Sequence, residues 1–327
     1  MKRKLLISLM ALTNALFALG SNMQGNVEKL QDTLVVDKSH NEEYICRIEP
    51  YMSLKGLKGI GSQGGACYDD YFIQGYVYNK QLSFYNLKEK RFMTTVEVPT
   101  DSIIPRCHSN TLNFSNLRYD ENDFFPLLYV SSGYTNKGVS YIYVYRITMS
   151  NEKDNETFLV THVQTICLHG FRGWTEGVID TVSNELWIKY QRKGDYGYAR
   201  FKMPNPTMQS VNIYYKDAES KFSIAKLPQN SNNQGHLFYG ERIFFTSGVP
   251  SKEQEIALLS INPSKGTYDY IIDLDEVGLI DKENPKSNAF EPESVIVYNG
   301  HLMICYRTAI YVIDLKKKSE QQNIPVE

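Results

Sequence analysis

Short apolar runs, separated by polar turn residues, repeat along most of this 327-residue chain. Many of the runs are rich in Tyr, Phe, Val and Ile, and runs of this kind bounded by turn residues are typical of β-strands. The segment 141–145 is apolar at every position, as expected of a strand that is covered on both faces. Helix signals are sparse, with a single helical turn expected within residues 274–280. The pattern therefore predicts an all-β fold.

A short polar signature opens each of five groups of predicted strands. The five signatures are Gln63-Gly64-Gly65, His108-Ser109-Asn110, Thr175-Glu176-Gly177, Gln234-Gly235-His236 and Glu291-Pro292-Glu293. Repeated units of three or four short strands predict a five-bladed β-propeller. In that fold the innermost strands run along a central channel, so residues that are far apart in the sequence meet at one end of it.

The strands expected in each unit follow from the apolar runs and the turns between them. The first unit comprises 65–68, 71–76, 81–87 and 91–98, and the second comprises 111–114, 126–131, 140–147 and 158–168. The third comprises 178–180, 185–190, 196–202 and 211–215, and the fourth comprises 237–239, 242–247, 255–261 and 267–272. The fifth has only 295–298, 301–306 and 309–315. The spare strand 43–48 is expected to complete it and so to close the ring.

The N-terminus has the features of a secretory signal peptide. Lys2, Arg3 and Lys4 precede an apolar run over residues 5–19, and small residues stand at Ala18 and Gly20. The alternative is an uncleaved anchor, although the run is short for a membrane span. We predict a signal peptide at 1–20, an N-terminal arm at 21–42, the β-propeller at 43–315 and a charged tail at 316–327. The protein is then exported to the periplasm, the cell surface or the extracellular space, with no transmembrane segment in the mature chain.

Composition changes this picture little. The formal net charge is -2 and the pI is about 6.3, so nothing suggests attraction to nucleic acid. The mean hydropathy of -0.38 fits a soluble protein. The chain has 5 cysteines, an odd number, and buried unpaired thiols are expected in place of a full set of disulfides.

The polar side chains of the signatures are expected to line a pocket where the innermost strands begin. The predicted ligand-binding residues are Gln63, His108, Asn110, Trp174, Glu176, Gln234, His236 and Glu293. A concave site with several convergent polar groups is the usual form of a ligand site. Residues two apart on a strand share a face, so Glu291 and Glu293 can act together. The alternative is that these side chains only satisfy backbone groups in a wet channel.

Three functions fit such a pocket. The first is an exported binding module that holds a glycan or cell-surface polymer, with Trp174 stacked on a sugar ring. The second is a glycoside hydrolase with paired carboxylates, for which the catalytic candidates are Glu176, Glu291 and Glu293, supported by His108. The third is a calcium-dependent esterase or lactonase in which Asn110 and the glutamates surround the ion. These residue types leave open whether the protein is an enzyme, and calcium is the one cofactor considered.

Taken in order, the signatures resemble a known propeller. Gln-Gly-Gly, His-Ser-Asn, Trp-Thr-Glu-Gly-Val-Ile-Asp, Gln-Gly-His and Glu-Pro-Glu are similar to motifs of the domain shared by teichoic-acid biosynthesis protein C-like proteins and some phage receptor-binding tail proteins. The resemblance covers roughly residues 43–315 and implies a five-bladed propeller associated with bacterial cell-surface polymers or other glycans. The family often has a Gly before the His and an Asp after the Asn, where this chain has Cys107 and Thr111.

Overall fold

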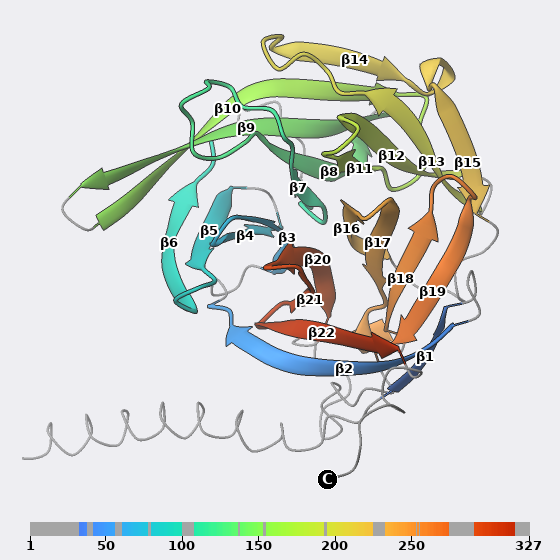
Figure 1. Cartoon of the computed structure of the whole chain (residues 1–327). Coiled ribbons are helices and arrows are strands. Elements are labelled where there is room, and N and C mark those ends of the chain that lie inside the picture. The colour runs from blue at the N-terminus through green and yellow to red at the C-terminus, as the bar shows by residue number, and fades with distance from the viewer. Residues whose placement is uncertain are drawn as a thin grey trace, which may run out of the picture.

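The computed structural model describes residues 33–37, 42–55, 61–77, 80–99, 108–136, 138–152, 155–192, 195–224, 233–252, 254, 256–274 and 291–317. Strands β1 to β22 of this part of the chain form five sheets around a common axis (Figure 1). Each sheet is one blade. The strand that comes first in the corresponding sequence unit lies next to the axis. The expected all-β, five-bladed propeller is confirmed.

The first two blades follow the expected order of strands. The first blade consists of β3 (Ser62–Tyr68), β4 (Tyr71–Tyr76), β5 (Gln81–Asn86) and β6 (Arg91–Glu97). The second consists of β7 (Leu112–Phe114), β8 (Leu128–Asn136), β9 (Val139–Glu152), β10 (Asn155–His169) and, on its outer edge, β14 (Ser210–Tyr214). The long β9–β10 hairpin extends beyond the ring, at the left of Figure 1.

The next two blades contain four strands each. The third blade consists of β11 (Glu176–Asp180), β12 (Glu185–Arg192), β13 (Asp195–Lys202) and β15 (Ser220–Ile224). The fourth consists of β16 (Asn233–Tyr239), β17 (Arg242–Ser247), β18 (Ala257–Asn262) and β19 (Thr267–Asp273). Two short 3₁₀ helices lie in connections, η2 (Tyr215–Asp217) and η3 (Pro250–Lys252).

The fifth blade is built from both ends of the described chain. It consists of β20 (Pro292–Tyr298), β21 (His301–Tyr306), β22 (Ala309–Lys317), β2 (Glu42–Ser53) and β1 (Thr33–Asp37). Strand β2 pairs antiparallel with β22, with Ile48 opposite Ile313. The expected closure of the ring by the early strand is therefore confirmed. The additional strand β1 lies within the segment that was expected to be an N-terminal arm, and it pairs with β2.

The prediction that residues 211–215 form the fourth strand of the third unit is wrong. The corresponding strand, β14, pairs in parallel with β10 of the second blade, with Ile213 opposite Leu168. The fourth strand of the third blade is β15, which pairs antiparallel with β13. An apolar run identifies a strand but not its partner. Strand β15 has the sequence Ser-Lys-Phe-Ser-Ile and therefore carries little apolar signal.

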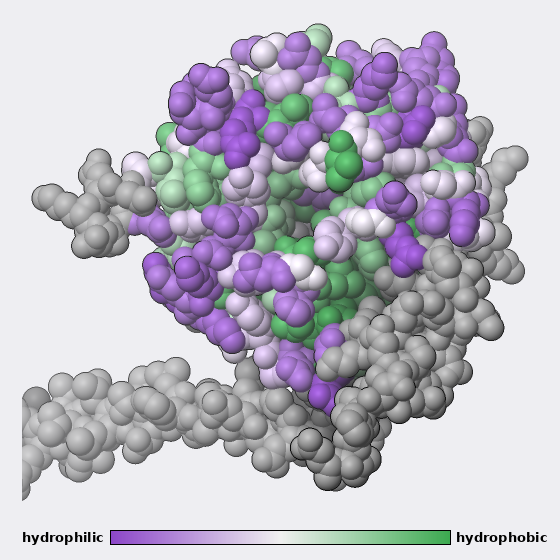
Figure 2. All heavy atoms as spheres, in the orientation of Figure 1, coloured by the Kyte–Doolittle hydropathy of each residue, from purple (hydrophilic) through white to green (hydrophobic). Residues whose placement is uncertain are grey.

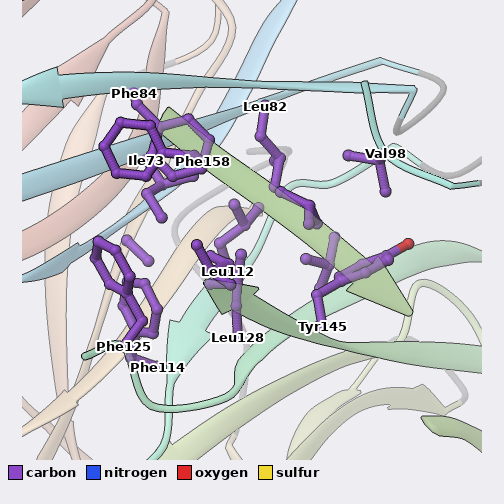
Figure 3. Packing of buried hydrophobic residues seen from close by; sticks show 14 of the residues in the cluster. Ile73, Leu82, Phe84, Val98, Leu112, Phe114, Phe125, Leu128, Tyr145 and Phe158 are labelled. Atoms are coloured by element: carbon purple, nitrogen blue, oxygen red, sulfur yellow. The ribbon is translucent and has the colours of Figure 1, made fainter. Parts of the chain in front are cut away.

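Apolar side chains fill the spaces between neighbouring blades. Figure 3 shows the cluster between the first and second blades, in which the rings of Phe84 and Phe158 stack with centroids 4.3 Å apart. The rings of Phe114 and Phe125 stack in the same cluster. Burial of an aromatic or aliphatic side chain stabilises the fold by about 1.5–3 kcal/mol. This packing holds the short innermost strand β7 in place against the first blade.

Two signature glycines allow the innermost strands to approach each other closely at the axis. The backbone N–H of Gly64 donates to the carbonyl oxygen of Ser109 at 3.0 Å, and a Cβ on Gly64 would lie 2.1 Å from the carbonyl oxygen of Asn110. A Cβ on Gly235 would lie 2.5 Å from the carbonyl oxygen of Glu293. Only glycine fits at these points, which explains why Gly follows Gln in two signatures.

Several expectations lie partly or wholly outside the described residues. The predicted signal peptide at 1–20 and residues 318–327 of the tail are among them, as is Cys107. Of the other cysteines, Cys67, Cys167 and Cys305 carry free thiols. Within the described ranges, no helix has the length and apolar character needed to cross a membrane.

Candidate functional site

The signature residues meet at the end of the channel where the innermost strands begin. Strand β3 contacts β7 and β20, and β16 contacts β11 and β20, so the five strand starts surround one axis. We call the polar group at this end the hub cluster. Its members are Gln63, His108, Asn110, Thr111, Trp174, Glu176, Lys189, Gln234, His236, Glu291, Glu293 and Arg307.

A chain of hydrogen bonds crosses the hub cluster from the second blade to the fifth. Nδ1 of His108 bonds to Oδ1 of Asn110, although both residues precede β7 and Ser109 between them has a φ of 51°. Nδ2 of Asn110 donates to Oε1 of Gln234 at 3.2 Å, and Nε2 of Gln234 donates to Oε1 of Glu291 at 2.9 Å. The chain joins blades that are not neighbours in the ring, so it holds the hub together across the axis.

Arg307 binds both carboxyl groups of the Glu-Pro-Glu signature. Its Nε donates to Oε1 of Glu293 at 2.7 Å, and its Nη2 lies 2.5 Å from Oε2 of Glu291. Burial and the neighbouring carboxyl of Glu291 raise the pKa of Glu293 to about 8, against the attraction of Arg307. Burial also raises the pKa of Glu291, and Arg307 opposes this shift. Near neutral pH the protonated form of Glu293 is therefore favoured, and Arg307 contacts both acids.

Glu176 is held on three sides. Nζ of Lys189 lies 2.9 Å from its Oε2, Nε1 of Trp174 donates to its Oε1 at 3.0 Å, and Nδ1 of His236 lies 3.2 Å from Oε2. The side chains of Glu176 and Lys189 are almost completely buried. Burial raises the pKa of Glu176, while the positive charge of Lys189 and the hydrogen bond from Trp174 oppose the rise. The pair brings no net charge to the hub.

His236 lies deep in the hub cluster as a neutral ring. Its imidazole stacks on Phe245 with centroids 5.2 Å apart and meets Tyr198 edge to face. Burial lowers the pKa of His236 well below its ordinary value, and the charge of Lys189 lowers it further. Nδ1 of His236 is directed at Glu176. The other ring nitrogen, Nε2, is buried and has no hydrogen-bond partner among the described residues.

The outer face of the hub cluster is formed by three partly exposed side chains. His108 and Trp174 meet edge to face with ring centroids 5.2 Å apart, and the side chain of Arg307 is 24% exposed. Trp174 also packs on Gly133, where a Cβ would lie 2.5 Å from Cζ2 of the indole. Burial lowers the pKa of His108, as does the charge of Arg307, against its hydrogen bond to Asn110. A ligand at this end would meet these three groups first.

Gln63 takes no part in the hydrogen bonds that join the other predicted residues. Its Nε2 donates to the carbonyl oxygen of its neighbour Ser62 at 2.8 Å, and the residue is 2% exposed. Its Oε1 is buried and has no hydrogen-bond partner within the described part of the chain, as is also true of Oε2 of Glu293. Oε1 of Gln63, Oε2 of Glu293 and Nε2 of His236 are therefore buried polar atoms of the hub cluster without a hydrogen-bond partner among the described residues.

The hub cluster does not fit the calcium site that was considered. Calcium sites combine several oxygen ligands with net negative charge. Here the carboxyls are already held by Lys189 and Arg307, and Glu293 is protonated at neutral pH. Among the described residues, no group of three or more His, Cys, Asp or Glu side chains is arranged to hold a metal ion.

The sequence patterns missed Lys189 and Arg307. Lys189 is the one charged residue in the apolar run Leu-Trp-Ile-Lys-Tyr of β12, and the hairpin register places it directly opposite Glu176. A lone lysine in a strand expected to be buried was the available signal. Arg307 follows the apolar strand β21 in the turn to β22, and Tyr306 pairs with Pro292. The available signal for Arg307 was the Glu-Pro-Glu signature, because two acids so close together indicate a neighbouring cation.

A cavity in the described structure lies away from the hub cluster. It has a volume of about 400 Å³ and is lined by the last residues of the innermost strands, at the opposite end of the channel. None of the predicted site residues lines it. Figure 2 shows a hollow at the centre of the ring with hydrophobic residues around it. The signature residues and this cavity therefore lie towards different ends of the channel, with Asn113 between them.

Asn113 closes the channel between its two ends. Its Nδ2 donates to the carbonyl oxygen of His236 at 3.0 Å, and its Oδ1 accepts from the N–H of Ile179 at 3.2 Å. The side chain is 5% exposed and also lines the cavity. It thus forms a partition, with the hub cluster on one side and the cavity on the other.

No family model matches the chain, and no curated protein sequence matches it either. Among solved structures, a glutaminyl cyclase from Myxococcus xanthus is 11% identical, with 83% of this chain and 95% of that chain covered and a TM-score of 0.48. A GH43 glycoside hydrolase is 11% identical over 80% of this chain and 51% of that one, with a TM-score of 0.46. The tail fibre of Staphylococcus aureus phage P68 is 9% identical over 84% and 54%, with a TM-score of 0.44. Likenesses at this level carry no argument on function, so the fold assignment rests on the sheet topology.

Proposed function

We propose that this chain is an exported propeller that binds a neutral glycan at the hub cluster. The observation that carries the proposal is that several buried polar atoms of the hub cluster lack a hydrogen-bond partner among the described residues, among them Oε1 of Gln63 and Oε2 of Glu293. One is an acceptor and the other belongs to a protonated carboxyl, which is a donor. Sugar hydroxyls both donate and accept hydrogen bonds, so a glycan offers partners to both kinds of atom. An unsatisfied buried polar group costs about 1–3 kcal/mol, which a ligand hydroxyl would recover.

The charge of the hub cluster supports a neutral ligand. Lys189 balances Glu176, and Arg307 balances Glu291. Burial lowers the pKa values of both hub histidines, and Glu293 is protonated at neutral pH. The cluster therefore carries a net charge near zero. A polyanion would find no excess positive charge here, whereas hydroxyl groups find fixed donors and acceptors.

The accessible groups of the hub cluster also suit a sugar. The Trp174 and His108 rings are fixed against each other, and the guanidinium of Arg307 lies close to the same face. Aromatic rings and planar polar groups are the side chains on which sugar rings commonly rest. Export is supported by the basic start and apolar run of residues 1–20.

Glycan turnover is the second candidate, favoured by one observation. Burial and the neighbouring Glu291 raise the pKa of Glu293 to about 8, and a carboxyl with a raised pKa beside a second acid is a pattern of acid–base catalysis. Release of reducing sugar by the wild type, lost in Glu293→Gln, would assign hydrolysis. Binding of glycan without any release by the wild type would assign the binding function.

The binding proposal is tested by titrating the purified protein with neutral oligosaccharides and with a phosphate-bearing surface polymer. Trp174→Ala should weaken binding of a neutral oligosaccharide about tenfold or more, or about 1.4 kcal/mol. The matched control is Tyr214→Ala, which removes an aromatic ring that is 43% exposed on the outer strand β14. Binding that prefers the phosphate polymer, or that is equal in wild type and Trp174→Ala, would contradict the proposal.

A further inference from the structure

The cavity at the opposite end of the channel has the features of a second binding site. Its volume of about 400 Å³ lies within the roughly 300–1,000 Å³ typical of small-molecule sites. Its walls are apolar side chains from all the innermost strands, with aromatic rings towards the mouth. The apolar wall residues include Tyr68, Leu112, Phe114, Ile179, Leu237 and Val297. Asn113 closes the inner end, so a ligand that enters from this side does not reach the hub cluster.

Arg118 lies at the mouth of this cavity and has no counter-ion among the described residues. It lines the cavity and is exposed, and its guanidinium lies over the ring of Tyr68. Its Nε donates to the carbonyl oxygen of Asp123, and its Nη2 donates to the hydroxyl of Tyr68 and the carbonyl oxygen of Phe124. All three acceptors are uncharged.

The remaining nitrogen of Arg118 is available to a ligand. Within the described part of the chain, Nη1 has no hydrogen-bond partner, and no carboxylate lies within salt-bridge distance of the guanidinium. The hydrogen bonds to Tyr68 and the loop nevertheless fix the direction of the group. A guanidinium that is held in place and left uncompensated suits a carboxylate, which Nη1 can bind through a charge-assisted hydrogen bond.

Exposed apolar side chains lie near the mouth, beside polar lining residues such as Asn116. Tyr239 at the end of β16 lines the cavity and is 46% exposed. Val182, in the turn after β11, is 93% exposed, and Phe124, in the connection after β7, is 37% exposed and packs edge to face on Tyr68. Exposed apolar side chains grouped around a concavity mark binding sites.

We propose that this cavity binds a small organic acid with an apolar body. The carboxylate pairs with Arg118 at the mouth, and the hydrocarbon part fills the channel as far as Asn113. The charge of Arg118 selects the acid over a neutral compound of the same shape. This site is separate from the hub cluster and does not depend on the function proposed for it.

The test is calorimetric titration of the whole protein with 4-phenylbutyrate and with its neutral counterpart, 4-phenylbutan-1-ol. The acid should bind with one-to-one stoichiometry and at least about tenfold more tightly than the alcohol, since a charge-assisted pair contributes about 1.5 kcal/mol or more. Arg118→Gln should remove this preference and leave the binding of the alcohol unchanged. The matched control is Arg91→Gln, which removes an exposed arginine on the outer strand β6 that is paired with Glu89.

Two further variants make the outcome decisive. Val297→Trp fills the cavity at a half-buried position and should abolish binding of both compounds, with circular dichroism to confirm the fold. Trp174→Ala, at the other end of the channel, should bind both compounds as the wild type does. Equal affinity for acid and alcohol in the wild type, an unchanged preference in Arg118→Gln, or no saturable binding at millimolar acid would overturn the proposal.

Discussion

Nε of Arg307 donates to Oε1 of Glu293 at 2.7 Å, yet the pKa of that buried carboxyl is raised to about 8. Burial and the carboxyl of Glu291 outweigh the guanidinium, because one cation is shared between two acids. A carboxyl whose folded pKa exceeds its unfolded pKa binds more protons in the folded state between those two values. The contribution of Glu293 to the free energy of unfolding is therefore complete below the unfolded-state pKa of about 4.5. It is lost as the pH rises towards the folded-state pKa of about 8.

The first prediction is that the free energy of unfolding falls between pH 5 and pH 8 and that Glu293→Gln flattens this fall. The fall attributable to Glu293 is on the order of 1–3 kcal/mol. Glutamine resembles the protonated carboxyl in shape and keeps an oxygen for Arg307. Urea unfolding at a series of pH values measures the effect. An identical pH dependence in wild type and variant would show that Glu293 titrates at its ordinary value.

The second prediction concerns the buried ion pair between Lys189 and Glu176. Lys189→Met leaves Glu176 as a buried carboxyl without its cation, and loss of one partner of a buried pair costs about 3–5 kcal/mol. The double variant Lys189→Met with Glu176→Gln should recover most of that loss, because it removes the uncompensated group as well. Chemical denaturation of the four proteins in the cycle measures this coupling.

The control for this pair is Lys202→Met. Nζ of Lys202 lies 3.9 Å from Oε1 of Glu219, and the lysine side chain is 86% exposed. A surface pair of this kind contributes at most about 1 kcal/mol. If Lys189→Met unfolds as easily as the control does, Glu176 is already protonated in the folded protein.

The propeller was predictable because each blade repeats the same physical pattern. Buried strands are apolar, and turns such as Asn299-Gly300 have the positive φ angles, 49° and 77°, that only a few residues adopt readily. The closure of the ring was also predictable, because the last unit lacked one strand and one early strand belonged to no unit. The partner of 211–215 was not predictable, because a short strand pairs as well in parallel with β10 as with a neighbour in its own unit.

The candidate site was only half predictable for a related reason. The signatures mark the starts of the innermost strands, and the fold brings those starts together whatever their chemistry. The cations that balance the acids, Lys189 and Arg307, come from the second strand and from a later turn, so they share no motif with them. The partition by Asn113 depends on bonds to two other blades, which no local pattern reveals.

The third prediction tests the glycine of the first signature. A Cβ on Gly64 would lie 2.1 Å from the carbonyl oxygen of Asn110, which is backbone and cannot move without shifting β7. Gly64→Ala should therefore destabilise the protein by about 2–4 kcal/mol or prevent folding. In Gly61→Ala the nearest atom is the Val77 side chain at 3.3 Å, so this control should stay within about 1 kcal/mol of wild type. Equal thermal midpoints for both variants would contradict the close approach at the axis.

The fourth prediction tests the partition of the channel. Asn113→Leu keeps much of the side-chain volume but leaves the N–H of Ile179 and the carbonyl oxygen of His236 without partners. Two unsatisfied buried groups cost about 2–5 kcal/mol of unfolding free energy. Asn116→Ala is the control, because Asn116 is exposed and donates a single bond to the carbonyl oxygen of Thr181. Urea denaturation should rank Asn113→Leu well below Asn116→Ala. A leucine variant as stable as the control would mean that water replaces the amide at the axis, and the two ends of the channel would then be continuous.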